Sequence, residues 1–204
     1  MISIDMTKLA WEKMDGLLPA IIQHAESGDV LMLGYMNQEA LTITVESHEL
    51  TFFSRSRQEL WRKGATSGHT MAVQAISTDC DGDSLLIQVL PQGPACHLGF
   101  KTCFQPFITT KLSFLNYLID LINERATSQT PNSYTTQLLQ AGIARCAQKV
   151  GEEATEVVIA AMKNDKEELV NEVADLIYHL LVLLKACEID FYQVVDCLIR
   201  RHNK

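Results

Sequence analysis

Residues 71–90 read MAVQAISTDCDGDSLLIQVL, and this stretch decides how the N-terminal half of the chain folds. Two runs rich in apolar and β-branched residues, 71–76 and 85–90, predict two β-strands. Three aspartates and a cysteine alternate between the runs; they are Asp79, Cys80, Asp81 and Asp83. If this segment is extended, the aspartates point to one side of the strand and the cysteine to the other.

The two kinds of side chain favour two different metal ions. Carboxylate oxygens suit Mg²⁺ or Ca²⁺, whereas a thiolate suits Zn²⁺. Cys96 and Cys103 follow in a loop of small and turn-forming residues, and three cysteines match a catalytic zinc site with one coordination position open to water. Two alternatives stay open. In the first, the aspartates form only an acidic surface turn. In the second, the cysteines form a structural zinc site or are three unrelated buried thiols.

The composition limits the class of protein. The chain has 204 residues, of which 47% are hydrophobic, enough for one sizeable core or two small ones. A formal charge of −8 and the lack of a basic run argue against a nucleic-acid-binding protein. The chain shows no signal-peptide core and no apolar run suited to a membrane span, and its six cysteines form no secretory framework. We therefore expect a cytoplasmic protein.

The hydrophobic pattern changes near residue 110. Before this point, short apolar runs alternate with turn signals, which is typical of strands. Besides the pair above, strands are expected at 17–25, 30–36 and 50–54. Asn37 is a suitable N-cap for a helix over 38–46. The first half is thus predicted to be α+β, with mostly antiparallel strands.

After residue 110 the strand signals disappear, and apolar residues recur at helical spacing. Helices are predicted at 112–125, 135–161, 167–186 and 190–201, with a polar break at 126–133. We expect two domains, 1–110 and 111–204, joined near residues 105–111, the second of them all-α. Domains this small often need metals or oligomerisation for stability.

Carboxylates gather on two of these helices. At about 100° per residue, Glu153 and Glu156 share one helix face with Lys149. Glu172 and Asp175 belong to a narrow polar stripe on the next helix, whose otherwise apolar surface predicts that it is mostly buried. Since buried carboxylates are costly unless paired or metal-bound, the acids predict an Mg²⁺ cage and metal-assisted phosphoanhydride hydrolysis. The alternative is that a nearby lysine or histidine simply neutralises them.

Both halves also resemble known families. Residues from about 17 to 105 resemble phosphoribosyl-AMP cyclohydrolase, through MLGYMNQEAL, FFSRSRQELWRKGATSGH, DCDGD and GPACHLGFKTCF. Residues from about 112 to 204 resemble phosphoribosyl-ATP pyrophosphohydrolase, an all-α relative of the MazG-type nucleotide pyrophosphohydrolases, through EExxE at 152–156 and ExxD at 172–175. The second pattern alone indicates only the superfamily. Its fusion to a cyclohydrolase indicates the bifunctional enzymes of histidine biosynthesis.

The resemblance implies two consecutive hydrolyses of small-molecule nucleotides. The C-terminal half would cleave phosphoribosyl-ATP to phosphoribosyl-AMP and pyrophosphate, and the N-terminal half would then open the adenine ring between N1 and C6. It also implies a homodimer with zinc shared between subunits, Cys80 coming from one chain and Cys96 and Cys103 from the other. The implied Mg²⁺ ligands are Asp79, Asp81 and Asp83 in the first domain and Glu153, Glu156, Glu172 and Asp175 in the second.

Further roles follow as hypotheses on the same basis. Zinc would lower the pKa of a bound water to roughly 7, and His69 or His97 would move a proton to N1. Each histidine is alternatively a phosphate contact or a support for a metal ligand. In the second domain, Glu153 or Glu156 would orient the attacking water. The expected substrate contacts are Arg55, Arg57, Trp61 and Lys63, with Trp61 alternatively a core residue, and Arg145 and Lys149 in the second domain.

Two other functions stay open. The first is a general nucleotide pyrophosphohydrolase whose N-terminal half binds metal and only recognises the substrate. The second is a non-enzymatic scaffold or metal sensor bridged by zinc, which requires a closed coordination shell around the ion.

Overall fold

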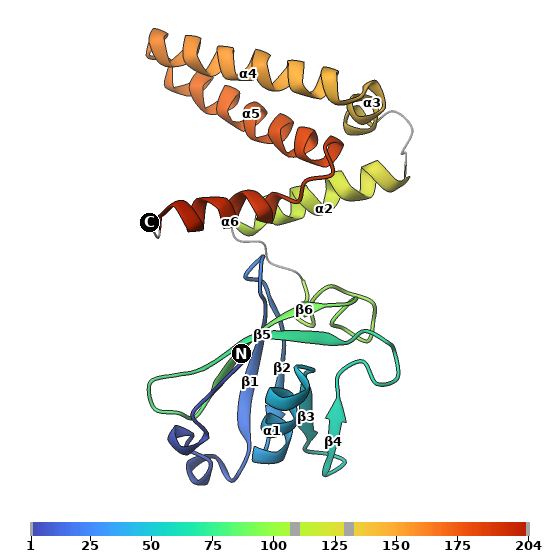
Figure 1. The fold of residues 1–204 in the computed structure, drawn as a ribbon, viewed down its shortest axis with the longest axis vertical. Helices are drawn as coiled ribbons and strands as arrows, with labels where there is room; N and C mark the ends of the chain where they lie inside the picture. Colours follow the sequence, from blue (N-terminus) through green and yellow to red (C-terminus); the bar gives the residue numbers. More distant parts are fainter. Residues whose placement is uncertain (1, 107–110, 129–132, 203–204) are drawn as a thin grey trace. The chain divides into compact units, whose positions relative to one another are not determined.

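The computed structural model describes residues 2–106, 111–128 and 133–202. By their contacts they form two compact units, Met1–Ser113 and Phe114–Lys204, called here the N-terminal unit and the C-terminal unit. The first contains all the strands of the described chain and the second is helical (Figure 1). Each unit is described by itself below.

A four-stranded sheet with the order β2-β1-β6-β5 forms the base of the N-terminal unit. Its strands are β1 (Leu18–His24), β2 (Val30–Met36), β5 (Met71–Thr78) and β6 (Leu85–Pro91). β1 pairs with β2, and β5 with β6, in antiparallel fashion, while β1 and β6 pair in parallel with Ala20 opposite Leu85. All four strands of this sheet are predicted from the sequence, with small shifts at their ends.

Helix α1 (Gln38–Ser47) begins where the sequence predicts it. The side chain of Asn37 accepts a hydrogen bond from the Ala40 N–H at 2.8 Å and so caps the helix. The helix is followed by β3 (Thr51–Ser54), which pairs with β4 (Glu59–Arg62) in a separate antiparallel ribbon. The sequence does not predict β4, because it is short and none of its four residues is buried.

The core of this unit is built by alternate residues of its central strands. Buried side chains from β1 and β6 are Leu18, Ala20, Ile22, Leu85, Ile87 and Val89. At the edge of the core, the Phe52 ring packs against the Cα of Gly34 so closely that a side chain there would collide with it. Phe52 also stacks on Trp61, with ring centroids 5.4 Å apart. This stack fixes the ribbon against β2.

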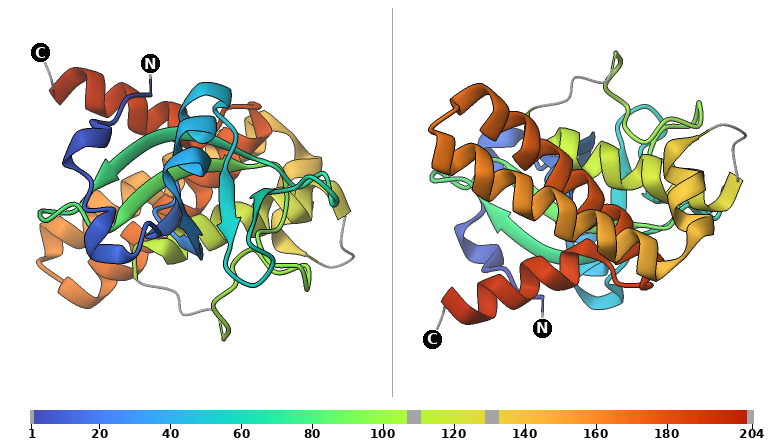
Figure 2. Two further views of the ribbon diagram at one scale, coloured as in Figure 1. Left: turned by 90° about the horizontal axis from the view of Figure 1, so that it is seen from below. Right: turned by 90° about the horizontal axis from the view of Figure 1, so that it is seen from above.

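The C-terminal unit contains the remaining helices of the described chain. They are α2 (Ser113–Ser128), α3 (Tyr134–Ala141), α4 (Ile143–Lys163), α5 (Lys166–Ala186) and α6 (Phe191–His202). α4 and α5 lie side by side along much of their length (Figure 2). The prediction of one helix over 135–161 is wrong, because Gly142 has a φ of 87° and breaks it into α3 and α4.

The prediction that the helix at 167–186 is mostly buried is also wrong for this unit. On α5 only His179, Leu181 and Val182 are buried, whereas Val170 is 68% exposed. The core formed by α5 with its neighbours includes Ile122, Leu138 and Cys146. The apolar pattern of α5 marks positions that can be buried but does not show what covers them.

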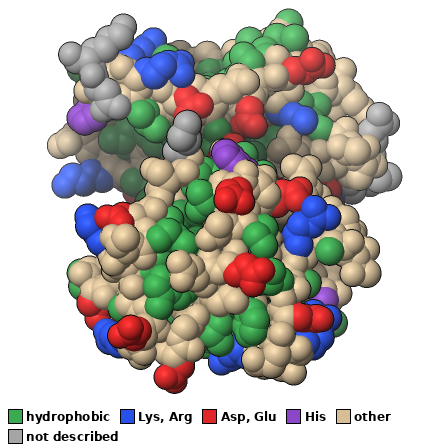
Figure 3. Space-filling view, turned by 60° about the horizontal axis from the view of Figure 1, so that its bottom comes forward, with side chains coloured by type: hydrophobic (Ala, Val, Ile, Leu, Met, Phe, Trp, Pro, Cys, Tyr) green, Lys and Arg blue, Asp and Glu red, His purple; other side chains and the backbone are tan. Residues whose placement is uncertain are grey.

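Large apolar side chains also reach the surface of the N-terminal unit. Residues 93–104 carry Cys96 and Cys103 and are called here the cysteine loop. Three of its side chains, Leu98, Phe100 and Phe104, are each roughly half exposed or more. On the face shown in Figure 3, apolar side chains lie among interspersed acidic and basic ones. Among the described helices, none is long and apolar enough to cross a membrane.

Candidate active sites

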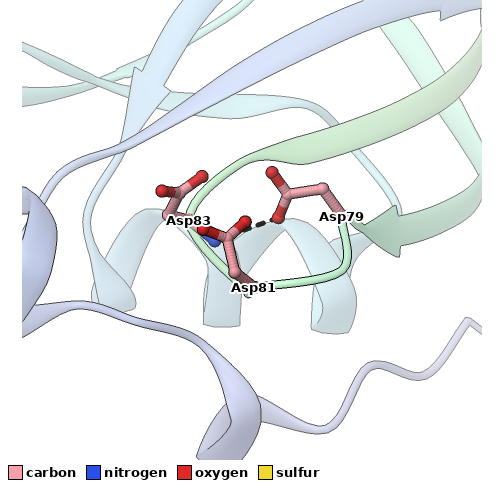
Figure 4. A group of neighbouring side chains, drawn as sticks. All are labelled: Asp79, Asp81 and Asp83. Atoms are coloured by element: carbon pink, nitrogen blue, oxygen red, sulfur yellow. Dashed lines mark hydrogen bonds between the residues drawn. The ribbon is translucent and has the colours of Figure 1, made fainter.

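The three aspartates lie in a turn between β5 and β6 rather than in extended backbone. Gly82 has a φ of 74°, and the Asp79 N–H reaches back to the Ser84 carbonyl at 3.3 Å. The prediction of an extended segment with alternating side chains is therefore wrong. The carboxylates come together nevertheless, since Asp79, Asp81 and Asp83 each offer an oxygen within 4.8 Å of the others (Figure 4). We call residues 79–84 the aspartate loop.

Asp79 holds this loop closed. Its carboxylate accepts hydrogen bonds from the backbone N–H groups of Asp83 and Ser84, at 3.0 and 3.2 Å, and from the Ser84 hydroxyl at 2.5 Å. The bond from the Ser84 hydroxyl is the main cause that lowers the pKa of Asp79 to about 2. Asp79 is therefore ionised at neutral pH and fixed in position.

Lys13 is a residue of this site that the sequence does not predict. It lies in a short 3₁₀ turn, Glu12–Met14, and its Nζ is 2.5 Å from Asp81 Oδ2 and also contacts Asp83 Oδ2. Hydrogen bonds to these two carboxylates raise the pKa of Lys13. No local pattern marks it, because the contact spans most of a hundred-residue unit. Three carboxylates facing one ammonium keep excess negative charge, which fits a hard divalent cation such as Mg²⁺.

Of the three cysteines, two lie together in this chain. Cys96 is buried, and Cys80 and Cys103 are exposed. Although Cys103 is exposed as a residue, partial loss of contact with water raises the pKa of its thiol, and the neighbouring Cys96 raises it further. Cys80 sits on the aspartate loop, and no group of three clustered ligand side chains in the described residues includes a cysteine. Two adjacent thiols are soft donors that fit Zn²⁺, and they leave its remaining positions to other groups.

Lys63 supports the cysteine loop from below the surface. Its side chain is buried, and its ammonium donates a hydrogen bond to the Ala95 carbonyl at 2.6 Å, next to Cys96. The positive charge of Lys63 opposes the rise in the pKa of Cys103. The two histidines belong to the same region. His69 packs its ring against Gly93, and His97 is exposed beside Cys96.

The two predicted arginines of this unit differ in their surroundings. The Arg55 guanidinium lies 3.7 Å from the centroid of the Tyr35 ring, a cation–π contact. Both residues line a hollow of about 290 Å³ together with Ser54, Ser56 and Trp61. Trp61 thus lines the hollow and also stacks on Phe52. Arg57 does not line it and instead pairs with Glu59 at 3.2 Å.

A second acidic cluster lies between α4 and α5. Glu153, Glu156 and Glu172 each offer an oxygen within 4.8 Å of the others. Glu153 is buried, at 5% exposure. Loss of contact with water raises the pKa of Glu172, and the Glu156 carboxylate raises it further. Asp175 is exposed and lies outside this cluster, so the structure gathers three of the four predicted carboxylates.

Basic side chains contact only one edge of this cluster. Lys149 Nζ lies 2.6 Å from Glu153 Oε1 and 2.9 Å from Glu152 Oε2, and Arg145 pairs with Glu152 at 3.4 Å. Glu156 and Glu172 form no ion pair in the described part of the chain. The alternative that a lysine neutralises these acids therefore accounts for Glu153 but leaves Glu156 and Glu172 to face each other. Oxygen donors with unbalanced charge fit Mg²⁺.

His179 borders the same cluster. Its Nε2 is 3.6 Å from Glu153 Oε1, and its Nδ1 is buried without a hydrogen-bond partner in the described chain. Burial lowers the pKa of His179, so the ring is neutral at pH 7. A neutral histidine does not balance the acids. It packs instead against the rings of Tyr134 and Tyr178.

Comparison with known proteins identifies both units. A family model described as phosphoribosyl-AMP cyclohydrolase matches residues 32–105, and one described as phosphoribosyl-ATP pyrophosphohydrolase matches residues 115–202. The histidine biosynthesis bifunctional protein HisIE of Yersinia pestis is 52% identical over 199 residues, which are 98% of this chain and 97% of that protein. The protein of the same description from Staphylococcus epidermidis is 50% identical over 189 residues, 93% of this chain and 89% of its own.

Proposed function

Because this chain belongs to the family of bifunctional histidine-biosynthesis proteins, we propose that its two acidic clusters serve two consecutive hydrolyses. The C-terminal unit is a phosphoribosyl-ATP pyrophosphohydrolase, which releases pyrophosphate and phosphoribosyl-AMP. The N-terminal unit is a phosphoribosyl-AMP cyclohydrolase, which opens the adenine ring between N1 and C6. A role in biosynthesis supports a cytoplasmic location.

One observation carries the division of labour. Each compact unit holds its own group of three carboxylates, and all three residues of a group belong to the same unit. Each cluster has more negative charge than its lysine balances. Both nucleotide substrates carry phosphates, so each site needs added positive charge before it can accept them. Metal dependence of both reactions follows from this.

In the C-terminal unit we assign Glu153, Glu156 and Glu172 to hold Mg²⁺, with Asp175 joining from one turn further along α5. A bound Mg²⁺ would supply positive charge that stabilises the polyphosphate in the transition state. Glu156 is exposed and free of basic partners among the described residues, which suits it to orient water and take its proton. Water then attacks phosphorus, the α–β anhydride bond breaks, and pyrophosphate leaves. Lys149 and Arg145 lie at the edge of the acidic cluster, where they can bind phosphate oxygens.

In the N-terminal unit we assign Cys96 and Cys103 to zinc, with Cys80 supplied by a second copy of the chain. A bound Zn²⁺ would supply an activated water for attack on the purine. The separation of Cys80 from the other two supports a homodimer that shares zinc. The exposed apolar side chains around the cysteine loop, Leu98, Phe100 and Phe104, support an interface there as well.

The remaining residues of that unit bind the substrate and move protons. Arg55, with Ser54 and Ser56 beside it, lines a hollow whose polar donors suit a phosphate, and Trp61 offers an aromatic face to the base. Water adds at C6, the C6–N1 bond breaks, and N1 takes up a proton. His69 or His97 carries this proton, since both lie at the loop that bears Cys96. The aspartate loop would hold Mg²⁺ for the substrate phosphate.

An assay of both steps tests this function. The chain is incubated with phosphoribosyl-ATP, Zn²⁺ and Mg²⁺, while pyrophosphate release and the absorbance change of ring opening are followed together. We expect both signals, with pyrophosphate first. Pyrophosphate release without ring opening would favour a general pyrophosphohydrolase with a recognition domain, and an absence of both would favour a metal-bridged scaffold.

A further inference from the structure

We propose that Lys13 is a tethered counter-ion of the aspartate loop, which a divalent cation displaces when it binds. The inference rests on the proposed metal role of this loop and adds a residue that sets its cation affinity and selectivity. Lys13 precedes residues 32–105, the segment that matches the cyclohydrolase family model, so that match assigns it no role.

The ammonium group of Lys13 lies where a cation held by the aspartates would bind. Lys13 Nζ contacts the Oδ2 atoms of both Asp81 and Asp83, at 2.5 Å from the first. A bound Mg²⁺ lies about 2.1 Å from its ligand oxygens. Since the three carboxylates offer oxygens within 4.8 Å of one another, an ion among them would lie against the ammonium. Two like charges at that separation repel strongly, so the ion and the ammonium exclude each other.

The backbone holds Lys13 at the loop independently of its charge. The Ala10 N–H donates to the Gly82 carbonyl at 2.8 Å. The Lys8 carbonyl packs so tightly on Gly82 that an added Cβ would lie 2.3 Å from its oxygen. Residues 8–13 therefore form an arm across the aspartate loop. The side chain of Lys13 is 53% exposed, so it can swing into solvent while the arm stays in place.

The ammonium group also affects which cations the aspartate loop can bind. Because Lys13 is tethered beside two carboxylates, its ammonium is present there at a high effective concentration. A free monovalent ion carries the same single charge, so it has no electrostatic advantage over the ammonium. A divalent ion brings twice the charge and can compete. The loop is thus expected to discriminate against Na⁺ and K⁺. Before a divalent ion binds, the ammonium reduces the repulsion between the carboxylates.

Mn²⁺ binding to the full-length, zinc-loaded protein tests the proposal. Bound Mn²⁺ is counted by electron paramagnetic resonance, and the loop site is the one that disappears in Asp81→Asn. We expect Lys13→Met to lower the dissociation constant of this site about three- to tenfold. The matched control is Lys8→Met, which removes the same charge from the same arm. In the described part of the chain Lys8 forms a salt bridge only with Asp5, at 3.5 Å, so Lys8→Met should leave the dissociation constant within about twofold of wild type.

Each other result overturns the proposal in a distinct way. Equal constants in the Lys13→Met and Lys8→Met variants would show that the ammonium does not compete. A higher constant in Lys13→Met would show that Lys13 orients the ligands instead. If Asp81→Asn removes no Mn²⁺ site, the metal role of the loop fails and the inference fails with it, whereas the other outcomes leave that role standing.

Thermal unfolding separates competition from a purely structural role. In zinc-loaded protein without added Mg²⁺, Lys13→Met should melt below Lys8→Met, because its aspartates have no counter-ion. In excess Mg²⁺ the gap should close, because the ion stabilises the folded state that binds it. A gap of the same size in excess Mg²⁺ would contradict displacement.

Discussion

Lys149 and Glu153 lie one turn apart on α4, and their Nζ and Oε1 atoms meet at 2.6 Å although Glu153 is only 5% exposed. The hydrogen bond from Lys149 is the main cause that lowers the pKa of Glu153. The pair thus fixes an ionised carboxylate at the edge of the cluster with Glu156 and Glu172. The neutral His179 on α5 packs beside it and adds no charge.

Removal of Lys149 should therefore impair the C-terminal reaction selectively. We expect Lys149→Met to slow pyrophosphate release by at least about tenfold, since Glu153 loses its partner and its orientation. Ring opening of supplied phosphoribosyl-AMP should be unchanged. Lys163→Met is the matched control, because Lys163 lies on the same helix and pairs with Glu168 at 3.6 Å at the surface. Equal losses in the two variants would argue against a role for the Lys149–Glu153 pair.

The buried His179 should make the metal-free C-terminal unit sensitive to mild acid. Its folded-state pKa lies below the ordinary value of 6.5, so between pH 7.5 and 5.5 the unfolded chain takes up a proton that the folded unit resists. Stability is therefore lost as the pH falls through 6.5. Melting temperatures in EDTA should fall across this window in wild type and less steeply in His179→Gln. Parallel pH profiles would contradict this assignment.

The hydrogen bond from Ser84 to Asp79 should matter for both the loop and its metal. Ser84→Ala removes the main cause of the low pKa of Asp79 and loosens the turn. We expect the melting temperature to drop by a few degrees and Mn²⁺ binding at the loop to weaken. Ser77→Ala, at an exposed position on β5, is the control and should change neither. Unaltered binding in Ser84→Ala would show that Asp79 needs no such support.

Substitutions at two glycines distinguish the cost of backbone strain from the cost of a steric clash. Gly82 and Gly99 both have positive φ, at 74° and 86°, but an added Cβ meets the Lys8 carbonyl only at Gly82 and meets nothing within 4 Å at Gly99. Gly99→Ala should cost about 1 kcal/mol from strain alone. Gly82→Ala should cost more, about 2–3 kcal/mol, and should expose residues 8–13 to protease. Equal costs would mean that the arm is not packed on the loop.

The sequence predicts most elements of the fold because local signals decide them. The strands around the aspartates are runs rich in apolar and β-branched residues, and Asn37 caps α1 as its side chain suggests. The failures share a cause in non-local or backbone geometry. Gly142 breaks a helix whose apolar pattern continues across it, and β4 is too short and too polar to stand out.

The candidate sites follow the same division. The acidic residues can be found from their spacing, but the turn at Gly82, not strand alternation, gathers the three aspartates. Lys13 could not be found, because its contact depends on how residues 8–13 pack on the aspartate loop. The exposed apolar side chains of α5 show that an apolar pattern does not indicate whether the residues that would bury it belong to the same chain.

Two single substitutions test the central claim, that each unit has its own active site, in one assay with phosphoribosyl-ATP and with phosphoribosyl-AMP. We predict that Glu156→Gln stops pyrophosphate release but still opens the ring of supplied phosphoribosyl-AMP. We predict that Cys103→Ser releases pyrophosphate and accumulates phosphoribosyl-AMP. Loss of both activities from either substitution, in protein that circular dichroism shows to be folded, would contradict two separate sites.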